Sequence, residues 1–322
     1  MKRRECMTDI LSVLNEKGLI KGIDDKELEN SMNHSRVFLV NEAAEKLVLK
    51  EIKQPWLTEV KLNKQGTFAN KMRQQMGGFV KVVQFPDGNY FFKHGEKIYT
   101  LESFCEGIEE KEYTRENCVD LASFLGKIHA VSDRFQLKFG YDGPWSVDFE
   151  HNCADDLQSE KEEYFNYFID SLKELNYDTE LITQVTTFFN QKITQLKEEL
   201  RLLPKGAVQG DLSLENVRFN EQHEVVGIFD YNICGDEVYI WDFINQIAWY
   251  LQNTSHQINL TPIMLEAYVQ QRPISEQEKA MVMKWVNFTY YTRYSIYMEF
   301  RYYARQGEHE KVHHYLKAFL SS

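Results

Sequence analysis

The hydrophobic and polar positions in the first third of the chain predict short strands separated by helices. A polar loop that begins at Ser31 runs into a β segment that ends at Val40. Further alternating or short apolar runs predict strands at Lys46–Ile52, Phe79–Gln84, Tyr90–Lys93 and Ile98–Phe104. Apolar residues at helical spacing predict helices at Thr8–Lys17 and Thr58–Gln75.

From Cys118 onwards, the apolar positions follow the spacing of helices. Helices are predicted at Cys118–Ala130, Ser159–Leu175 and Asp178–Leu203, and the chain beyond Phe243 is expected to be helical throughout. The segment Trp285–Tyr303 is unusually rich in tyrosine. It fits a buried helix whose tyrosine hydroxyls reach its edges, or the wall of a pocket for an ammonium group.

A predicted hairpin brings three polar side chains to one end. Its strands are Val217–Phe219 and Val225–Phe229, with a polar turn between them. Asp211 and Asn216 precede the first strand, and Asp230 follows the second. Because a hairpin returns the chain to its starting end, these three residues are expected to lie close together.

The spacing of these three residues is typical of phosphoryl-transfer enzymes. The pattern D-x-x-x-x-N, followed by a second Asp after an apolar strand, matches two pieces of the protein-kinase signature. In that chemistry the first Asp accepts or orients the proton of the attacking hydroxyl, and the Asn and the second Asp hold Mg²⁺ on the phosphates. Asp211 is therefore the candidate catalytic residue, and Asn216 and Asp230 are the candidate metal ligands.

The wider context resembles the aminoglycoside phosphotransferase and choline kinase superfamily, which includes homoserine-kinase-like and spore-coat-associated members. The matching positions are Gln209, Gly210, Asp211, Asn216, Val217, Val225, Gly227, Ile228, Asp230 and Tyr231. This resemblance implies an α+β, two-lobed protein-kinase-like fold. An N-terminal lobe with an antiparallel sheet (residues 1–104) would cover the nucleotide, and a larger, mainly helical lobe (residues 105–322) would bind substrate. The implied reaction moves the γ-phosphoryl group of ATP, with Mg²⁺, to a hydroxyl of a small molecule such as an amino alcohol, homoserine, choline or an aminoglycoside.

The resemblance also implies a nucleotide site in the N-terminal lobe. Lys50, in a V-L-K setting, is the better of two candidates for the phosphate-binding lysine, the other being Lys53. Glu59 would pair with Lys50, or would be a first-turn acid that the helix dipole favours. Residues from Ser31 to Ser35 would cover the phosphates, and Glu102 to Phe104 would form the hinge that reads the base. His129 matches a family histidine, and the simpler interpretation is a hydrogen-bonded core residue.

The sequence departs from the family pattern at two places, and two alternative functions stay open. Gln209 stands where the family has His, and Ser213 with Leu214 replaces His-Pro. Gln both donates and accepts hydrogen bonds, so it can still support the loop. One alternative is a catalytically quiet binding protein that keeps the fold. The other is a zinc metallopeptidase, because His309-Glu310-x-x-His313 satisfies the H-E-x-x-H pattern.

The charge and the composition limit the binding partners and the cellular compartment that we expect. A formal net charge of −12 argues against nucleic acid as a partner and is compatible with a cationic small substrate. The five cysteines form no C-x-x-C pair, which favours a reducing compartment. The sequence has no apolar run of membrane-spanning length. We therefore expect a cytoplasmic protein without a membrane anchor, and the oligomeric state stays open.

Overall fold

The computed structural model describes residues 14, 26–27, 35–42, 45–143, 160–254 and 259–322. Backbone packing divides the chain into two compact units. The first contains Met1–Lys111 together with Ser213–Asn232, and the second contains Glu112–Leu212 together with Ile233–Ser322. The predicted hairpin therefore packs with the N-terminal part of the chain. The predicted contiguous division between residues 104 and 105 stays a prediction.

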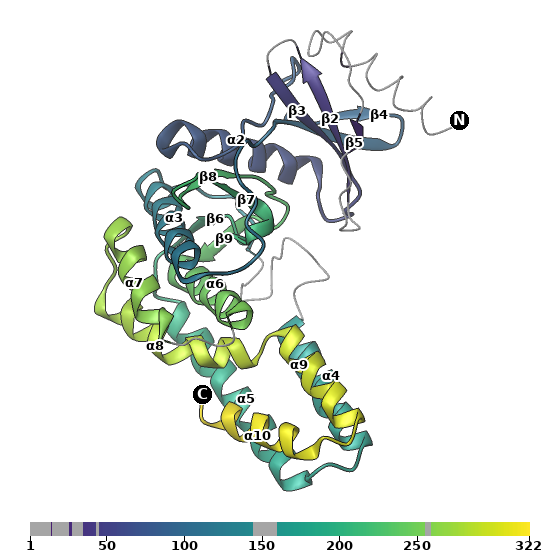
Figure 1. Cartoon of the computed structure of the whole chain (residues 1–322), viewed down its shortest axis with the longest axis vertical. Coiled ribbons are helices and arrows are strands. Elements are labelled where there is room, and N and C mark those ends of the chain that lie inside the picture. Colours follow the sequence, from purple (N-terminus) through teal and green to yellow (C-terminus); the bar gives the residue numbers. More distant parts are fainter. Residues whose placement is uncertain (1–13, 15–25, 28–34, 43–44, 144–159, 255–258) are drawn as a thin grey trace. The chain divides into compact units, whose positions relative to one another are not determined.

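The first unit is built on an antiparallel sheet with the strand order β1-β2-β3-β5-β4 (Figure 1). The strands are β1 (Lys26–Glu27), β2 (Ser35–Glu42), β3 (Glu45–Ile52), β4 (Phe92–His94) and β5 (Lys97–Ser103). Strands β3 and β5 pair so that Lys50 lies opposite Thr100 and Val48 opposite Glu102. Because side chains alternate along a strand, Lys50 and Glu102 lie on the same face of the sheet.

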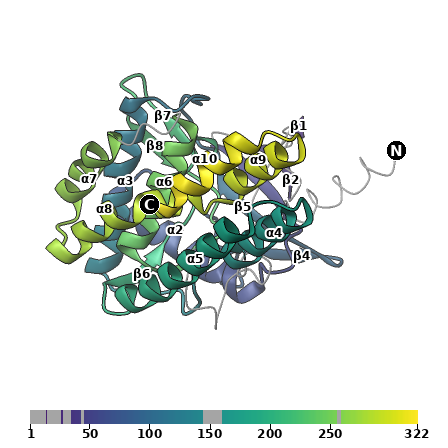
Figure 2. The ribbon, with the colours of Figure 1, turned by 90° about the horizontal axis from the view of Figure 1, so that it is seen from below.

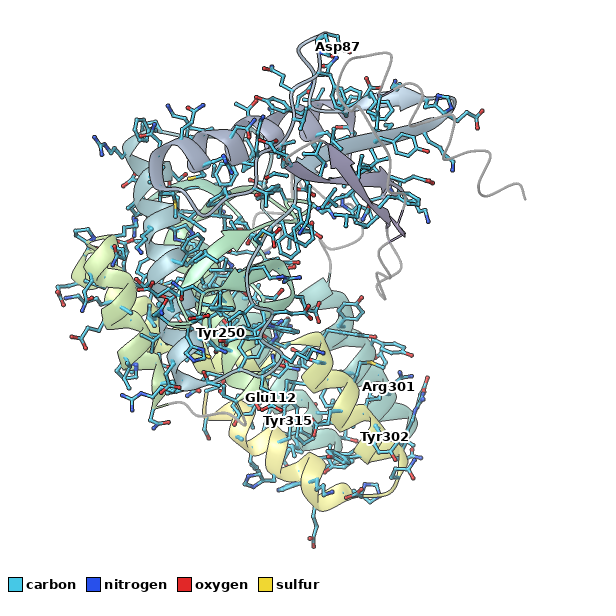
Figure 3. The ribbon with its side chains drawn as sticks, turned by 45° about the horizontal axis from the view of Figure 1, so that its top comes forward. Asp87, Glu112, Tyr250, Arg301, Tyr302 and Tyr315 are labelled. Carbon is cyan, nitrogen blue, oxygen red and sulfur yellow. The ribbon has the colours of Figure 1, made fainter. Side chains whose placement is uncertain are left out.

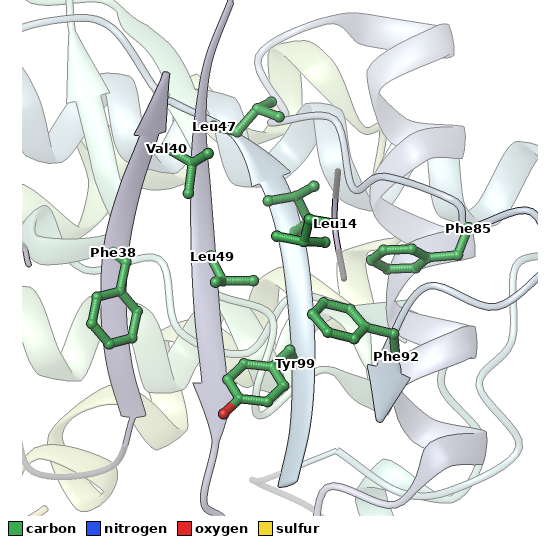
Figure 4. Close-up of a cluster of buried hydrophobic side chains, with 9 residues drawn as sticks. Leu14, Phe38, Val40, Leu47, Leu49, Phe85, Phe92 and Tyr99 are labelled. Carbon is green, nitrogen blue, oxygen red and sulfur yellow. The ribbon is translucent and has the colours of Figure 1, made fainter. Parts of the chain in front are cut away.

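The other face of this sheet carries a hydrophobic core (Figure 4). Leu47 and Leu49 of β3 pack there with Tyr99 and Leu101 of β5. The remaining members of this cluster are Leu14, Phe38, Val40, Phe85 and Phe92. Strand alternation thus places this cluster on the face of the sheet opposite Lys50.

Helix α2 (Glu59–Met76) follows the third strand, as predicted. Its Thr58 side chain accepts a hydrogen bond from the Lys61 N–H, which satisfies one of the first N–H groups of the helix. The helix ends at Gly77, whose φ of 70° lies in the left-handed region that glycine adopts without strain. The buried face of α2 contains Leu62, Gln65, Gly66, Phe68, Ala69 and Met72.

The strand predicted at Phe79–Gln84 is wrong. This segment forms only isolated bridges, from Phe79 to Ile228 and from Val82 to Glu102. The Asn70 side chain of α2 donates to the Val82 carbonyl at 2.8 Å and accepts from the Val82 N–H at 3.0 Å. On the other side of Val82 the segment bonds to β5, where the Val83 N–H donates to the Leu101 carbonyl and the Ser103 N–H to the Lys81 carbonyl, both at 2.8 Å. The pairing therefore stays at a single bridge to β5, and a side chain takes the Val82 groups that a further strand would use. The adjoining turn carries Asp87 at its tip (Figure 3), and the strand predicted at Tyr90–Lys93 is confined to β4.

The predicted hairpin is confirmed as β7 (Val217–Phe219) and β8 (Val225–Ile228), preceded by the short 3₁₀ helix η1 (Leu214–Asn216). Phe219 exchanges two backbone hydrogen bonds with Ile108, of 2.8 and 2.9 Å. The Ile228 N–H donates to the Gly78 carbonyl at 2.7 Å. These bonds attach both strands of the hairpin to the first unit.

The second unit is mainly helical (Figures 1 and 2). Its helices are α3 (Arg115–Arg134), α4 (Glu160–Glu174), α5 (Thr179–Leu200), α6 (Tyr239–Asn253), α7 (Leu260–Gln271), α8 (Glu276–Tyr291), α9 (Tyr294–Arg305) and α10 (His309–Leu320). A two-stranded ladder joins β6 (Lys205–Val208) to β9 (Gly235–Val238). The helices predicted from residue 118 to residue 203 are confirmed within a few residues. None of the helices in the described residues is long and apolar enough to span a bilayer.

The tyrosine-rich segment forms α8 and α9, and most of it packs in the second unit. Trp285, Phe288 and Tyr297 are buried. Tyr302 is exposed, and the neighbouring Arg301 guanidinium lies 4.0 Å from the Tyr167 ring centroid on α4 (Figure 3). Packing between helices therefore accounts for the aromatic content at these positions.

Candidate active site

The candidate catalytic loop follows strand β6 in the second unit. The Gln209 side chain is fully buried, and its Oε1 accepts a hydrogen bond of 2.7 Å from the Asp211 N–H. Gly210, between them, has a φ of 84°, which only glycine adopts readily. The Tyr250 hydroxyl of α6 donates to the Leu212 carbonyl at 2.9 Å. Gln209 thus provides the loop support that the sequence suggested for the residue replacing the family histidine.

The two candidate metal ligands lie on the hairpin of the first unit. The Asn216 carbonyl accepts a hydrogen bond of 3.0 Å from the Phe229 N–H, so Asn216 lies beside the residue that precedes Asp230. Asp230 has a φ of 68°, in the left-handed region that non-glycine residues rarely adopt. Such strain persists only where surrounding contacts impose it, and it concentrates at functional sites. The Asp230 Oδ1 accepts from the Asn232 N–H at 3.1 Å.

This pair of side chains suits Mg²⁺. Mg²⁺ prefers oxygen ligands and is usually held by one or two carboxylates, with waters and substrate phosphates completing its coordination. Asp230 offers a carboxylate and Asn216 a carboxamide oxygen. Within the described residues no group of three or more His, Cys, Asp or Glu side chains lies close enough together to hold a metal ion. The donor set therefore fits a metal whose remaining ligands come from a bound nucleotide.

Lys50 forms an ion pair with Glu102 on the neighbouring strand. The two side chains are 17% and 6% exposed. Burial alone would lower the pKa of Lys50, but the Glu102 and Asp230 carboxylates raise that pKa above its ordinary value. Lys50 is therefore a cation, and it also lies 6.0 Å from the centroid of the Phe229 ring.

A small cavity adjoins the Lys50 side chain. Its volume of about 30 Å³ is roughly that of one water molecule. Its lining includes Lys50, Glu102, Gln65, Tyr90 and Asn232. Gln65 is 4% exposed, and its side chain donates to the Asn232 carbonyl at 3.4 Å. Sequence reasoning missed Gln65, although a polar residue among the apolar positions of α2 was a detectable signal.

The predicted pair between Lys50 and Glu59 is wrong. Glu59 instead forms an ion pair with Lys93, and both side chains are about half exposed. Glu59 lies in the first turn of α2, at the exposed end of the helix, where the dipole favours an acid. The buried face of the helix presents Gln65 to the cavity instead.

The remaining candidates of the nucleotide site that the structure describes lie on or beside the interior strands β2 and β5. Ser35 begins β2, opposite Ile52, and Ser31 lies outside the described residues. Phe104 donates its N–H to the Lys46 carbonyl at 2.8 Å, so this N–H is already occupied. Glu102, expected as a hinge residue, has its side chain directed to Lys50 rather than into the hinge.

The structure also shows the positions of His129 and of the H-E-x-x-H segment. His129 is fully buried, with its Nδ1 2.8 Å from the Tyr268 hydroxyl and its Nε2 3.1 Å from Asp242, which confirms the core interpretation. His309, Glu310 and His313 are exposed on α10. Within the described part of the chain, no third ligand joins them in a group that could hold a metal ion.

The sequence matches a protein family and is similar to a kinase sequence. Residues 27–273 match the profile of the phosphotransferase enzyme family. Over 197 residues the chain is 25% identical to a homoserine kinase from Parvibaculum lavamentivorans, a match that covers 59% of the chain and 54% of that relative. The chain thus spans about half the length of this relative.

Solved structures share the fold. A microcompartment-associated aminopropanol kinase superimposes with a TM-score of 0.64 at 14% identity, covering 96% of this chain and 95% of that one. An amicoumacin kinase, solved with AMP-PNP and Ca²⁺, gives 0.62 at 14% identity, covering 99% and 96%. The choline kinase LicA from Streptococcus pneumoniae gives 0.52 at 15% identity, covering 98% and 100%. These likenesses confirm the expected α+β, protein-kinase-like fold. Together with the profile, which covers most of the chain, they lead to one conclusion: the protein belongs to the phosphotransferase enzyme family.

Proposed function

We propose that the protein is a small-molecule kinase that uses ATP and Mg²⁺ to phosphorylate an alcohol. The acceptor oxygen attacks the γ-phosphorus, the bond from that phosphorus to the β,γ-bridging oxygen breaks, and ADP leaves. The hydroxyl proton passes to Asp211. The strained Asp230, fixed beside Asn216 in the unit that also holds the buried cation Lys50, is the observation that carries the proposal.

Each residue has a separate role in this proposal. Asp211 orients the hydroxyl and accepts its proton, and Gln209 holds the Asp211 backbone in place. Asn216 and Asp230 hold Mg²⁺, which neutralises the charge that develops on the phosphates. Lys50 binds the α- and β-phosphates. Catalysis then comes from alignment and charge neutralisation, since a loose phosphoryl transition state asks for little covalent chemistry.

We infer that the acceptor is an amino alcohol. Homoserine, aminopropanol and choline, named in three of the relatives, each combine a hydroxyl with a positively charged nitrogen. The net charge of −12 favours the approach of such a cation. Aminoglycosides combine the same groups in a larger molecule and form the second class to test.

A coupled assay of ADP release over homoserine, aminopropanol, choline and an aminoglycoside tests the proposal. Asp211→Asn should lower kcat by about 10²- to 10⁴-fold while nucleotide binding persists. Asp230→Asn should abolish the Mg²⁺ dependence of ATP binding. Asp170→Asn, on an exposed carboxylate of α4, is the control and should change neither quantity.

Three results would count against the proposal, each in a different way. Failure of the wild-type protein to bind ATP in the presence of Mg²⁺ would remove the kinase assignment altogether. Mg²⁺-dependent ATP binding without turnover of any alcohol would instead support the catalytically quiet alternative. Full activity in Asp211→Asn would refute the role given to that residue.

A further inference from the structure

We propose that Glu102, on strand β5, is the positioning residue that holds Lys50 for the nucleotide phosphates, in place of an acid from helix α2. This inference rests on the kinase function proposed above. It concerns how this chain organises its phosphate-binding lysine, and it assigns the Glu102 side chain a part in that reaction.

The register of the sheet makes this pair possible. Lys50 lies opposite Thr100, and Glu102 lies two residues further along β5, so the two side chains are diagonal neighbours on one face. At this separation a long lysine reaches the carboxylate of the adjacent strand. Both partners of the resulting ion pair stand on directly paired strands rather than on a loop.

Helix α2 supplies no acid to Lys50. Within Glu59–Met76 the one acidic residue is Glu59, and it is paired with Lys93 at the exposed end of the helix. The residue of α2 that lines the cavity beside Lys50 is Gln65. Its amide is neutral, and it donates to the Asn232 carbonyl. An amide cannot serve as the counter-ion of a buried ammonium group, so Glu102 takes that role.

Burial makes the counter-ion necessary. Burial disfavours the charged form of a lysine side chain that is only 17% exposed, and a neighbouring anion opposes that effect. Glu102 and Asp230 are the carboxylates that favour the ammonium form of Lys50. The ammonium group has three N–H donors, so a pair with Glu102 leaves donors for a phosphate oxygen. Glu102 therefore fixes both the charge and the direction of the side chain without occupying it fully.

The chain contains a matched pair for comparison. Glu51 of β3 and Lys97 of β5 form an ion pair of 3.1 Å between the same two strands, and Glu51 is 6% exposed. Strand alternation places Glu51 on the face opposite Lys50. Loss of the Glu51 charge therefore removes an equivalent cross-strand pair without touching the side chain proposed to bind phosphate.

The test compares the binding of ATP with Mg²⁺ and the binding of adenosine, measured by calorimetry on the full chain. Glu102→Gln should weaken ATP binding by about 10- to 100-fold, because a charge-assisted contact to phosphate is lost, and should leave adenosine binding unchanged. Glu51→Gln should change neither affinity. The double variant Glu102→Gln with Gln65→Glu returns an acid to the same cavity from α2 and should recover most of the ATP affinity.

Thermal unfolding of each variant confirms that the compared proteins are folded. Unchanged ATP binding in Glu102→Gln would overturn the inference, and so would an equal loss for ATP and adenosine, which indicates a structural role. A double variant that binds ATP no better than Glu102→Gln would also overturn it. Absence of ATP binding in the wild type is a different result, because it removes the proposed kinase function itself.

Discussion

The protein contains two clusters of buried charged side chains, and we assign one of them to ligand binding and the other to packing. In the first unit, Lys50 and Glu102 pair beside a small cavity. In the second unit, Arg272 donates to Glu278 at 2.8 Å, next to the bonds from His129 to Tyr268 and Asp242. Both clusters are buried, and a small cavity adjoins the cation of the first.

The second cluster is the more deeply buried of the two. His129, Asp242 and Tyr268 are fully buried, and Arg272 and Glu278 are 4% and 3% exposed. Burial lowers the pKa of His129 despite its bond to Asp242, so this histidine is neutral and acts as a hydrogen-bonding core residue. Burial and charge alone therefore do not mark a site. An adjoining cavity and a strained backbone nearby, as at Lys50 and Asp230, are the informative additions.

The largest expected effect is on the stability of the second cluster. Arg272→Met removes the partner of Glu278 and leaves a carboxylate in the core, which should lower the free energy of unfolding by about 3–5 kcal/mol. Lys50→Met should cost clearly less, because Glu102 borders a cavity that has room for one water molecule. Urea unfolding of both variants measures the difference.

For ATP binding, the expected order is the reverse: Lys50→Met should have the larger effect and Arg272→Met the smaller one. Lys50→Met should lose ATP binding while it remains folded, and any Arg272→Met protein that remains folded should bind ATP as the wild type does. Equal destabilisation by the two substitutions would break the distinction between a packed cluster and a binding cluster.

The sequence predicted the elements with strong periodicity and the motif with a fixed spacing. The hairpin β7–β8 and helices α2, α3 and α5 follow from patterns within single segments. The partner of Lys50 did not follow, because β3 and β5 are far apart in the chain and their register decides which acid lies beside the lysine. The failed strand at Phe79–Gln84 has a similar origin, since the Asn70 side chain of α2 takes the backbone N–H and carbonyl of Val82. Long-range pairing of this kind leaves no local signal.

The support of the catalytic loop was partly predictable. Gln209 could be recognised as a residue able to replace a histidine, because its amide both donates and accepts. The bond from the Tyr250 hydroxyl to the Leu212 carbonyl could not be foreseen, since it joins α6 to the loop across the fold. Nothing in the sequence around Asp230 announced its positive φ, because aspartate has no general preference strong enough to predict it.

The next expected effect concerns a buried acid on strand β9. Glu237 is 2% exposed, and its Oε1 accepts from the Val238 N–H at 2.9 Å. Burial raises the pKa of Glu237 to about 8. The folded state thus holds a proton that the unfolded state releases near pH 4.5. The stabilisation from this proton is complete below pH 4.5 and disappears as the pH rises through 8, by about 1.4 kcal/mol per pH unit between those values.

Glu237→Gln tests this pH dependence, because the amide keeps the shape without the titration. The difference in unfolding free energy between wild type and variant should fall steadily from pH 5.5 to pH 7.5 in urea titrations followed by tryptophan fluorescence. Glu266→Gln, an exposed position on α7, is the control and should show no such trend. A constant difference across this range would mean that Glu237 keeps its charge in the folded protein.

The smallest expected effect concerns the cavity that distinguishes the two clusters. Gly66 of α2 and Tyr90 both line it. A Cβ at position 66 would overlap the Tyr90 side chain, with only 2.6 Å to its Cδ1. The Tyr90 Cβ is also 2.6 Å away, and rotation of the ring does not move it, so backbone must shift. The Tyr90 N–H donates to the Asn63 side chain of the same helix at 2.8 Å, and this bond resists a separation of Tyr90 from α2. Gly66→Ala gains about 1 kcal/mol of helix propensity and loses about 1–3 kcal/mol to overpacking, so a net loss of about 1 kcal/mol is expected.

Thr67→Ala, on the exposed side of the same helix, lacks the overlap and should not be destabilised to that extent. If Gly66→Ala were as stable as the wild type, α2 and Tyr90 would be able to move apart without cost. The cavity beside Lys50 would then not be a fixed feature, and it could not be used to distinguish the two clusters.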